Sequence, residues 1–268
     1  MPSALREHWP EYAIEAFLLG TFMLVAAVAT TLTEFPGSSV HRALPDTFTR
    51  RVVIGAAMGF TAAALIYSPW GRRSGAHMNP AITLAFYRLG KVEPWDAVFY
   101  VVAQFAGGVA GVLLAQALLG SPFTAPPVRD IATGPGPAGA VAAFAGEFVI
   151  SLTMMSMVLY TSNHPRLKPW TGAFSGLLII AFVVYESPLS GFSMNPARTV
   201  ASALPSGVWT SAWIYFVAPT LGMQAAIDAY RWATGRRHVI CAKLAHDIED
   251  AYCIFRCGHR LNLLRGRA

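Results

Sequence analysis

The chain contains six long apolar runs, and these runs hardly contain a charged residue. They fall at residues 12–32, 51–67, 95–119, 140–160, 170–185 and 209–232. Most approach the ~20 residues that a helix rising about 1.5 Å per residue needs to cross a hydrocarbon layer of about 30 Å. The pattern predicts an all-α membrane protein with six transmembrane helices.

Two more apolar pieces, 79–89 and 195–204, follow the second and fifth runs and are too short to span. Short hydrophobic pieces at matching places in two halves of a chain are typical of broken helices at a transport site. We expect three spans and one half-helix in each half. The predicted parts are an N-terminal segment 1–11, a first half 12–119, a connecting loop 120–139, a second half 140–232 and a tail 233–268.

The sequences around the two short pieces repeat. Ser74–Thr83 (SGAHMNPAIT) and Ser190–Thr199 (SGFSMNPART) align without a gap (195 − 79 = 116) and share seven of ten residues. A Gly-x-x-x-Gly pair precedes each, at 55/59 and at 172/176. Such a repeat indicates a duplicated half. Because each half has an odd number of spans, the second half lies inverted in the membrane, and the half-helices enter from opposite faces.

Composition agrees with a membrane protein. Hydrophobic residues make up 54% of the 268 and charged residues 13%, whereas soluble domains carry roughly a quarter charged residues. The net charge of +6 does not indicate nucleic acid, because the basic residues lie between and after the apolar runs. We predict no cleaved signal peptide, since the first run is long enough to remain as a span.

The distribution of Lys and Arg predicts that both ends of the chain face the cytoplasm. The basic residues then on the inside are Arg6, Arg72, Arg73, Arg88, Lys91, Arg166, Lys168, Arg231, Arg236, Arg237, Lys243, Arg256, Arg260, Arg265 and Arg267, and those outside are Arg42, Arg50, Arg51, Arg129 and Arg198. The pair Arg50-Arg51 runs against this rule. All seven tryptophans lie at or near the ends of apolar runs, where an indole prefers the membrane interface.

The boxes Asn79-Pro80-Ala81 and Asn195-Pro196-Ala197, with Arg198 directly after the second, resemble the major intrinsic protein family of aquaporins and glycerol facilitators. The resemblance covers about residues 12–232. It implies an aquaporin-like fold of six spans and two re-entrant half-helices, and a homotetramer with one pore per subunit. It also implies a passive channel. We predict that the chain is not an enzyme and uses no cofactor or metal.

Each box has the chemistry of a helix start. Asn is a favoured N-cap and Pro is favoured at the first helical position. In a soluble protein one box would indicate only a capped surface helix, but irregular backbone at membrane depth must be buried in protein or line a cavity. Two N-termini meeting near the midplane each carry about half a positive charge and repel cations. We hypothesise that a water accepting from both Asn79 and Asn195 cannot relay a proton.

By resemblance, a selectivity filter has four corners. Two are Arg198 and Phe192, a third is Val183, and the fourth is Met58 or Gly59. An arginine within an apolar stretch is costly and usually functional, although a structural ion pair is the alternative.

Each half also carries one carboxylate within an apolar run, Glu15 in the first and Glu147 in the second. The resemblance gives them a scaffold role toward the re-entrant loops, although Gly20-Thr21 lies farther from Glu15 than in typical members. A proton relay in a coupled transporter is the alternative.

The selectivity signals divide. Val183 stands where water-selective members have His, and 188–192 (PLSGF) resembles glycerol facilitators, whereas Thr199, Ala203 and Tyr215-Phe216 do not match facilitators. We predict a water channel, with passage of glycerol or other small neutral solutes as the alternative and a coupled transporter as a remote one. His77 alone supplies no catalytic cluster and is expected beside the cytoplasmic mouth.

Several metal-binding residue types crowd the tail: His238, Cys241, His246, Cys253, Cys257 and His259. Cys and His suit zinc, but Cys-x-x-x-Cys with scattered His is not a standard spacing. The sequence therefore favours reduced thiols, without a disulfide framework, in a basic tail near anionic headgroups. We expect a multi-pass protein of the plasma (inner) membrane whose partners are water, small neutral solutes and lipid.

Overall fold

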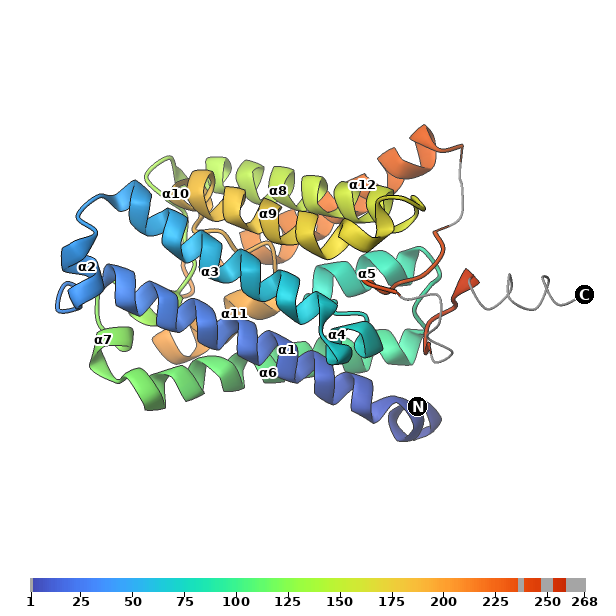
Figure 1. Cartoon of the computed structure of the whole chain (residues 1–268), viewed down its shortest axis with the longest axis horizontal. Helices are drawn as coiled ribbons and strands as arrows, with labels where there is room; N and C mark the ends of the chain where they lie inside the picture. The colour runs from blue at the N-terminus through green and yellow to red at the C-terminus, as the bar shows by residue number, and fades with distance from the viewer. Residues whose placement is uncertain (1, 236–238, 247–252, 259–268) are drawn as a thin grey trace, which may run out of the picture.

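A computed structural model describes residues 2–235, 239–246 and 253–258, and every regular element in these ranges is helical (Figure 1). The long helices are α1 (Pro2–Glu34), α3 (Thr47–Tyr67), α6 (Pro94–Leu119), α8 (Gly139–Ser162), α9 (Thr171–Tyr185) and α12 (Ile214–Ala233). The two half-helices are α5 (Pro80–Arg88) and α11 (Pro196–Ser206). The short elements are α2 (Ser39–Ala43), α4 (Pro69–Ser74), α7 (Ser121–Thr124), η1 (Arg129–Ile131), η2 (Lys168–Trp170) and α10 (Ser187–Ser190). The predicted all-α membrane fold is confirmed.

Several boundaries differ from the prediction. The segment 1–11, expected to precede the first span, belongs to α1 from Pro2 onward. Its last turns are anchored by Arg73 Nε against Glu11 Oε1 at 2.7 Å and by the Tyr12 hydroxyl, which donates to Asp96 Oδ1 at 2.6 Å. The connecting loop contains α7 and η1, and α12 begins only after a turn at 210–213.

The sixth span is less apolar than the others. By length and composition, five of the described helices could cross a membrane: α1, α3, α6, α8 and α9 extended by η2. α12 has 20 residues, enough for about 30 Å, but Gln224, Asp228 and Arg231 interrupt its apolar sequence. Asp228 Oδ1 pairs with Arg88 Nη2 of α5 at 2.7 Å. The position of α12 therefore depends on its packing against α8 and α5.

The two halves interlock. α1 packs along α6 and α8 along α12, whereas α3 packs against α9 of the other half. Half-helix α11 lies against α6, and α5 lies against α12. At the α3–α9 crossing, a β-carbon on Gly59 would overlap the Gly176 carbonyl oxygen, and one on Gly176 would lie 2.6 Å from the Gly59 oxygen. Small residues thus let the two backbones touch, as in other membrane helix pairs.

Large apolar side chains cover the outside of the bundle. Phe60 is 68% exposed and Leu118 66% exposed, and all seven tryptophans are exposed. Soluble proteins rarely leave so much apolar surface in water, so this surface suits lipid contact. Trp95, Trp170 and Trp232 lie at helix ends, as expected of interfacial indoles.

The bundle has two distinct ends (Figure 1). The start of α1, α4 and the described tail segments lie at one, which we call the tail end. α2, α7 and α10 lie at the other, which we call the loop end. α5 extends from the centre toward the tail end and α11 toward the loop end. The N-termini of the half-helices therefore meet in the middle of the molecule.

Candidate functional site: a pore between two half-helices

Both half-helices begin with the caps that the boxes predict. Asn79 has an extended backbone, and its Oδ1 accepts from the Ala81 N–H at 2.9 Å. Asn195 Oδ1 accepts from the Ala197 N–H at 3.0 Å and from the Arg198 N–H at 3.3 Å. Proline follows each Asn at the first helical position. The caps hold the carboxamides at the positive ends of the half-helices.

The two caps also bind across the repeat. Asn79 Nδ2 donates to the Met194 carbonyl at 2.8 Å, and Asn195 Nδ2 donates to the Met78 carbonyl at 2.7 Å. A carboxamide nitrogen carries two hydrogens. Each Asn therefore keeps one N–H for another acceptor.

The loops before the boxes hold strained backbone. Ala76 (φ 54°), Met78 (φ 49°), Phe192 (φ 52°) and Met194 (φ 57°) all lie in the left-handed region. This conformation costs a residue with a side chain about 1–2 kcal/mol. The surrounding structure must compensate for that strain.

The Glu15 carboxylate binds the loop that precedes the first box. Its Oε1 accepts from Ser74 Oγ at 2.7 Å and the His77 N–H at 3.0 Å. Its Oε2 accepts from the Met78 N–H at 2.6 Å and Gln104 Nε2 at 2.9 Å. The spacing of Gly20-Thr21 therefore does not remove Glu15 from the loop.

Glu147 binds the second loop in the same manner. Its Oε1 accepts from Ser190 Oγ at 2.8 Å and the Ser193 N–H at 2.7 Å, and its Oε2 accepts from the Met194 N–H at 2.6 Å. The carboxylate is fully buried. These hydrogen bonds restrain the residues that carry the positive φ angles.

Two tyrosines complete this arrangement, and the sequence analysis did not assign them this role. The Tyr100 hydroxyl donates to the Ser74 carbonyl at 2.6 Å, and the Tyr215 hydroxyl donates to the Ser190 carbonyl at 2.6 Å. Their nearly equal distances from the two boxes along the chain (100 − 79 = 21 and 215 − 195 = 20) are the signal that could have identified them.

A narrow inner cavity of about 80 Å³ passes the two boxes. It runs from Leu244 and His77 at the tail end, past Asn79 and Asn195, to Arg198. A water molecule needs about 10–15 Å³ of such space. The inner cavity therefore has room for a few waters beside the two carboxamides.

A wider outer cavity of about 390 Å³ lies at the loop end. Met58, Phe192 and Arg198 border both cavities, and Val183 borders the outer one. Gly59, the other candidate for the fourth corner, lies instead in the contact between α3 and α9. We call Met58, Val183, Phe192 and Arg198 the collar.

The connecting loop holds Arg198 in place. Its Nη1 donates to the Ile131 carbonyl at 2.9 Å, to Thr133 Oγ1 and to Ser202 Oγ at 3.3 Å. These acceptors are neutral, so the guanidinium keeps its positive charge beside both cavities. Nothing in the sequence indicated this role for Ile131 and Thr133.

His77 lies at the tail end of the inner cavity, as expected of a residue beside a mouth. Its Nδ1 lies 3.1 Å from Thr83 Oγ1 and its Nε2 lies 2.9 Å from the Ala242 carbonyl oxygen. The ring stacks between Phe86 and Phe255, at centroid distances of 5.2 and 5.4 Å. The tail thus covers this mouth.

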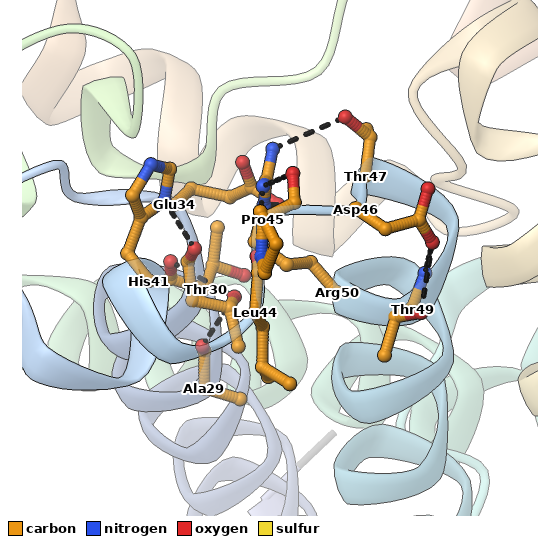
Figure 2. A network of polar contacts seen from close by, with 11 residues as sticks. Ala29, Thr30, Glu34, His41, Leu44, Pro45, Asp46, Thr47, Thr49 and Arg50 are labelled. Carbon is orange, nitrogen blue, oxygen red and sulfur yellow. Dashed lines mark hydrogen bonds and ion pairs between the residues drawn. The ribbon is translucent and has the colours of Figure 1, made fainter.

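Arg50 is a structural clamp at the loop end. Its Nε donates to Glu34 Oε1 at 3.1 Å, its Nη1 to the Pro45 carbonyl at 2.9 Å and its Nη2 to Thr47 Oγ1 at 3.2 Å. Figure 2 shows these groups around its side chain. This partly buried ion pair gives Arg50 a structural reason to lie where the charge rule disfavours it.

We expect Arg50→Leu to destabilise the loop end, because it leaves Glu34 and Pro45 without their donor. Losing a partly buried charged network costs about 2 kcal/mol, which lowers the melting temperature by about 4–8 °C in a domain of this size. Tryptophan fluorescence during heating in detergent measures the melting temperature. The control is Arg42→Leu, whose Nη1 makes one exposed bond to the Gly37 carbonyl; equal shifts in both variants would contradict the clamp.

Comparison with known proteins identifies the family. A family model described as major intrinsic protein matches residues 7–230. The chain is 38% identical to "Probable aquaporin TIP4-2" of Oryza sativa subsp. japonica over 181 residues, which covers 66% of this chain and 64% of that protein. It is 36% identical to "Aquaporin NIP1-3" of the same plant, covering 80% of this chain and 71% of the relative. The solved aquaglyceroporin from Plasmodium falciparum has the same fold, with a TM-score of 0.69, 19% identity and coverage of 84% of this chain and 96% of that one.

Proposed function

The chain belongs to the major intrinsic protein family, whose members are channels and not enzymes, and on this premise we propose that it conducts water along osmotic gradients while excluding protons and ions. The observation that carries this proposal is the collar. Met58, Phe192 and Arg198 border both cavities, so a solute passing between the cavities must pass them. The narrow inner cavity beyond the collar suits a file of waters.

Exclusion of charge is attributed to three groups. Arg198 places a buried guanidinium at the junction of the cavities, where a cation would be repelled. The N-termini of α5 and α11 add their partial positive charges at the centre. The remaining N–H groups of Asn79 and Asn195 orient a water oxygen between them and interrupt the proton path.

Small neutral solutes such as glycerol are the second candidate, and the chemistry of the collar favours them. Met58, Val183 and Phe192 are apolar, so Arg198 is the collar's one strongly polar side chain. Thr199 and Tyr215, which pointed to water, are not among the residues bordering the two cavities and bind Ser193 and Ser190 instead. Their family signal therefore concerns packing around the pore.

Stopped-flow light scattering of proteoliposomes separates the two candidates. We expect sucrose gradients to give fast shrinkage, and glycerol gradients then report whether the collar admits glycerol. Val183→His adds a polar ring to the collar and is expected to lower any glycerol permeability about tenfold while keeping water flux. Val183→Leu controls for added size alone. Water and glycerol fluxes at the level of empty liposomes would contradict the open channel.

We further propose a plasma (inner) membrane location with the tail end in the cytoplasm. Arg72 and Arg73 of α4 lie at the tail end, as does α1's start (Figure 1), and the excess of Lys and Arg on that side supports this orientation. Protease access to the tail in inside-out and right-side-out vesicles tests it. A homotetramer is proposed from the family, and native mass in mild detergent tests it; a stable monomer would contradict it.

A further inference from the structure

Four metal-ligating side chains converge in the tail, outside the pore. The Sγ atoms of Cys241, Cys253 and Cys257 and a ring nitrogen of His246 all lie within 4.8 Å of one another, and all four residues are buried. Cys241 Sγ lies 3.6 Å from Cys253 Sγ, and Cys257 Sγ lies 3.3 Å from His246 Nε2. These are the chain's three cysteines, brought together from two separate segments.

Two of the six distances between these four atoms match the edges of a tetrahedral zinc site, and the others are at most 4.8 Å. Zinc–sulfur bonds of about 2.3 Å and zinc–nitrogen bonds of about 2.0 Å give edges of about 3.8 Å between sulfurs and about 3.5 Å between sulfur and nitrogen. The Cys241–Cys253 and Cys257–His246 distances lie within about 0.2 Å of these values. The Cys241–Cys253 separation is far from the S–S bond length of about 2.05 Å in a disulfide.

The described tail segments have little regular secondary structure of their own. Residues 239–246 contain no helix or strand. The Gly258 N–H donates to the Ile240 carbonyl at 2.8 Å and joins the two described segments to each other. Short segments without a core of their own usually need a metal or disulfide to stay folded. Three thiols and an imidazole suit zinc better than the oxygen-preferring cations.

The same segments dock on the pore mouth. The Leu244 N–H donates to the Gly75 carbonyl at 3.1 Å, and the Arg256 N–H donates to the Lys91 carbonyl at 3.0 Å. Arg256 Nε also pairs with Glu93 Oε1 at 2.5 Å. Leu244 borders the inner cavity, and Phe255 stacks on His77. The cluster therefore fixes the residues that cover the tail end of the pore.

We propose that Cys241, His246, Cys253 and Cys257 bind one zinc ion that fastens the tail over the tail-end mouth of the pore. All four coordination positions are filled by protein, which is the arrangement of a structural site. The unusual Cys-x-x-x-Cys spacing favoured reduced thiols, but the fold brings Cys241 and His246 of one segment to Cys253 and Cys257 of another. His238 and His259 lie outside the described residues.

Metal analysis of the full chain tests the site. The protein is purified in mild detergent through a tag without histidine, in reducing buffer and without chelators. We expect about one zinc ion per chain by mass spectrometry of the elements, as in other closed four-ligand sites. Cys253→Ser and Cys257→Ser are expected to lose it. His41→Ala, whose ring contacts the Thr33 carbonyl oxygen at 2.7 Å, is the matched control and keeps it.

Two measurements on the unmodified chain guard against variants that fail to fold. Replacing zinc with Co²⁺ should give the visible absorption of a tetrahedral site with thiolate ligands. Chelation should also expose Lys243, which is 2% exposed in the closed tail, and raise the rate of trypsin cleavage there about tenfold or more.

Three results would overturn the proposal. The first is a wild-type chain that contains no zinc and shows no visible absorption with Co²⁺. The second is zinc retained in the Cys253→Ser/Cys257→Ser double variant. The third is a Cys241–Cys253 disulfide in place of the metal. The site does not depend on what the pore conducts. A zinc-loaded chain without flux contradicts only the proposed function, and a conducting chain without zinc contradicts only the site.

Discussion

Arg198→Ala is expected to raise glycerol permeability about tenfold or more and to admit small cations. The substitution removes the charged corner of the collar and opens the space between the two cavities. A loss of about 1.4 kcal/mol in discrimination already corresponds to a factor of ten, and a buried guanidinium contributes at least that against a cation. Liposomes loaded with a pH-sensitive dye measure the leak of protons. Stopped-flow light scattering measures the uptake of glycerol.

The control for this variant is Arg51→Ala. Arg51 borders the wide outer cavity and is not part of the collar. The Arg51→Ala substitution therefore removes the same charge without widening the junction between the cavities. Two results would contradict the assignment of the selectivity filter to the collar. These are unchanged selectivity in Arg198→Ala, or an equal change in selectivity in both variants.

Glu147→Ala is expected to abolish the folded channel. It leaves Ser190 Oγ and the N–H groups of Ser193 and Met194 without their acceptor in a buried loop that already carries positive φ angles. Each buried donor left unsatisfied costs about 1–3 kcal/mol. The loss therefore rivals the whole stability of many proteins, about 5–15 kcal/mol.

The yield of monodisperse protein and its melting temperature in detergent measure this effect. Glu147→Gln keeps one acceptor oxygen and should lie between the wild type and Glu147→Ala. Glu7→Ala, at an exposed position of α1, controls for loss of a carboxylate. Normal yield and normal flux from Glu147→Ala would contradict the scaffold role.

The sequence predicted the fold because a membrane leaves few alternatives. Backbone groups in lipid must be paired within helices, so runs of apolar residues map directly onto spans. The half-helices were equally readable, since Asn79-Pro80 and Asn195-Pro196 contain both the cap and the first turn. The edges of elements were not, because α1 continues to Pro2 through contacts with Arg73 and Asp96 that are distant in sequence.

The collar could be predicted only in part. Arg198 and Phe192 adjoin a box, so their position follows from the motif. The choice between Met58 and Gly59 depends on the rotation of α3 about its axis, which the glycine contact with α9 decides. The support of Arg198 by Ile131 and Thr133, and the clustering of the tail cysteines, both arise from loops, where sequence spacing does not determine distance.

The exchange of hydrogen bonds between Asn79 and the Met194 carbonyl, and between Asn195 and the Met78 carbonyl, sets an order of events during synthesis. During synthesis, the first half-helix leaves the ribosome long before residue 194 has been added to the chain. Glu15 and Tyr100 of the first half already bind the first re-entrant loop, but the Met78 carbonyl gains its Asn195 partner only when the second half is present. The bonds between the two boxes, and with them the finished centre of the pore, can therefore form only when nearly the whole chain has been made.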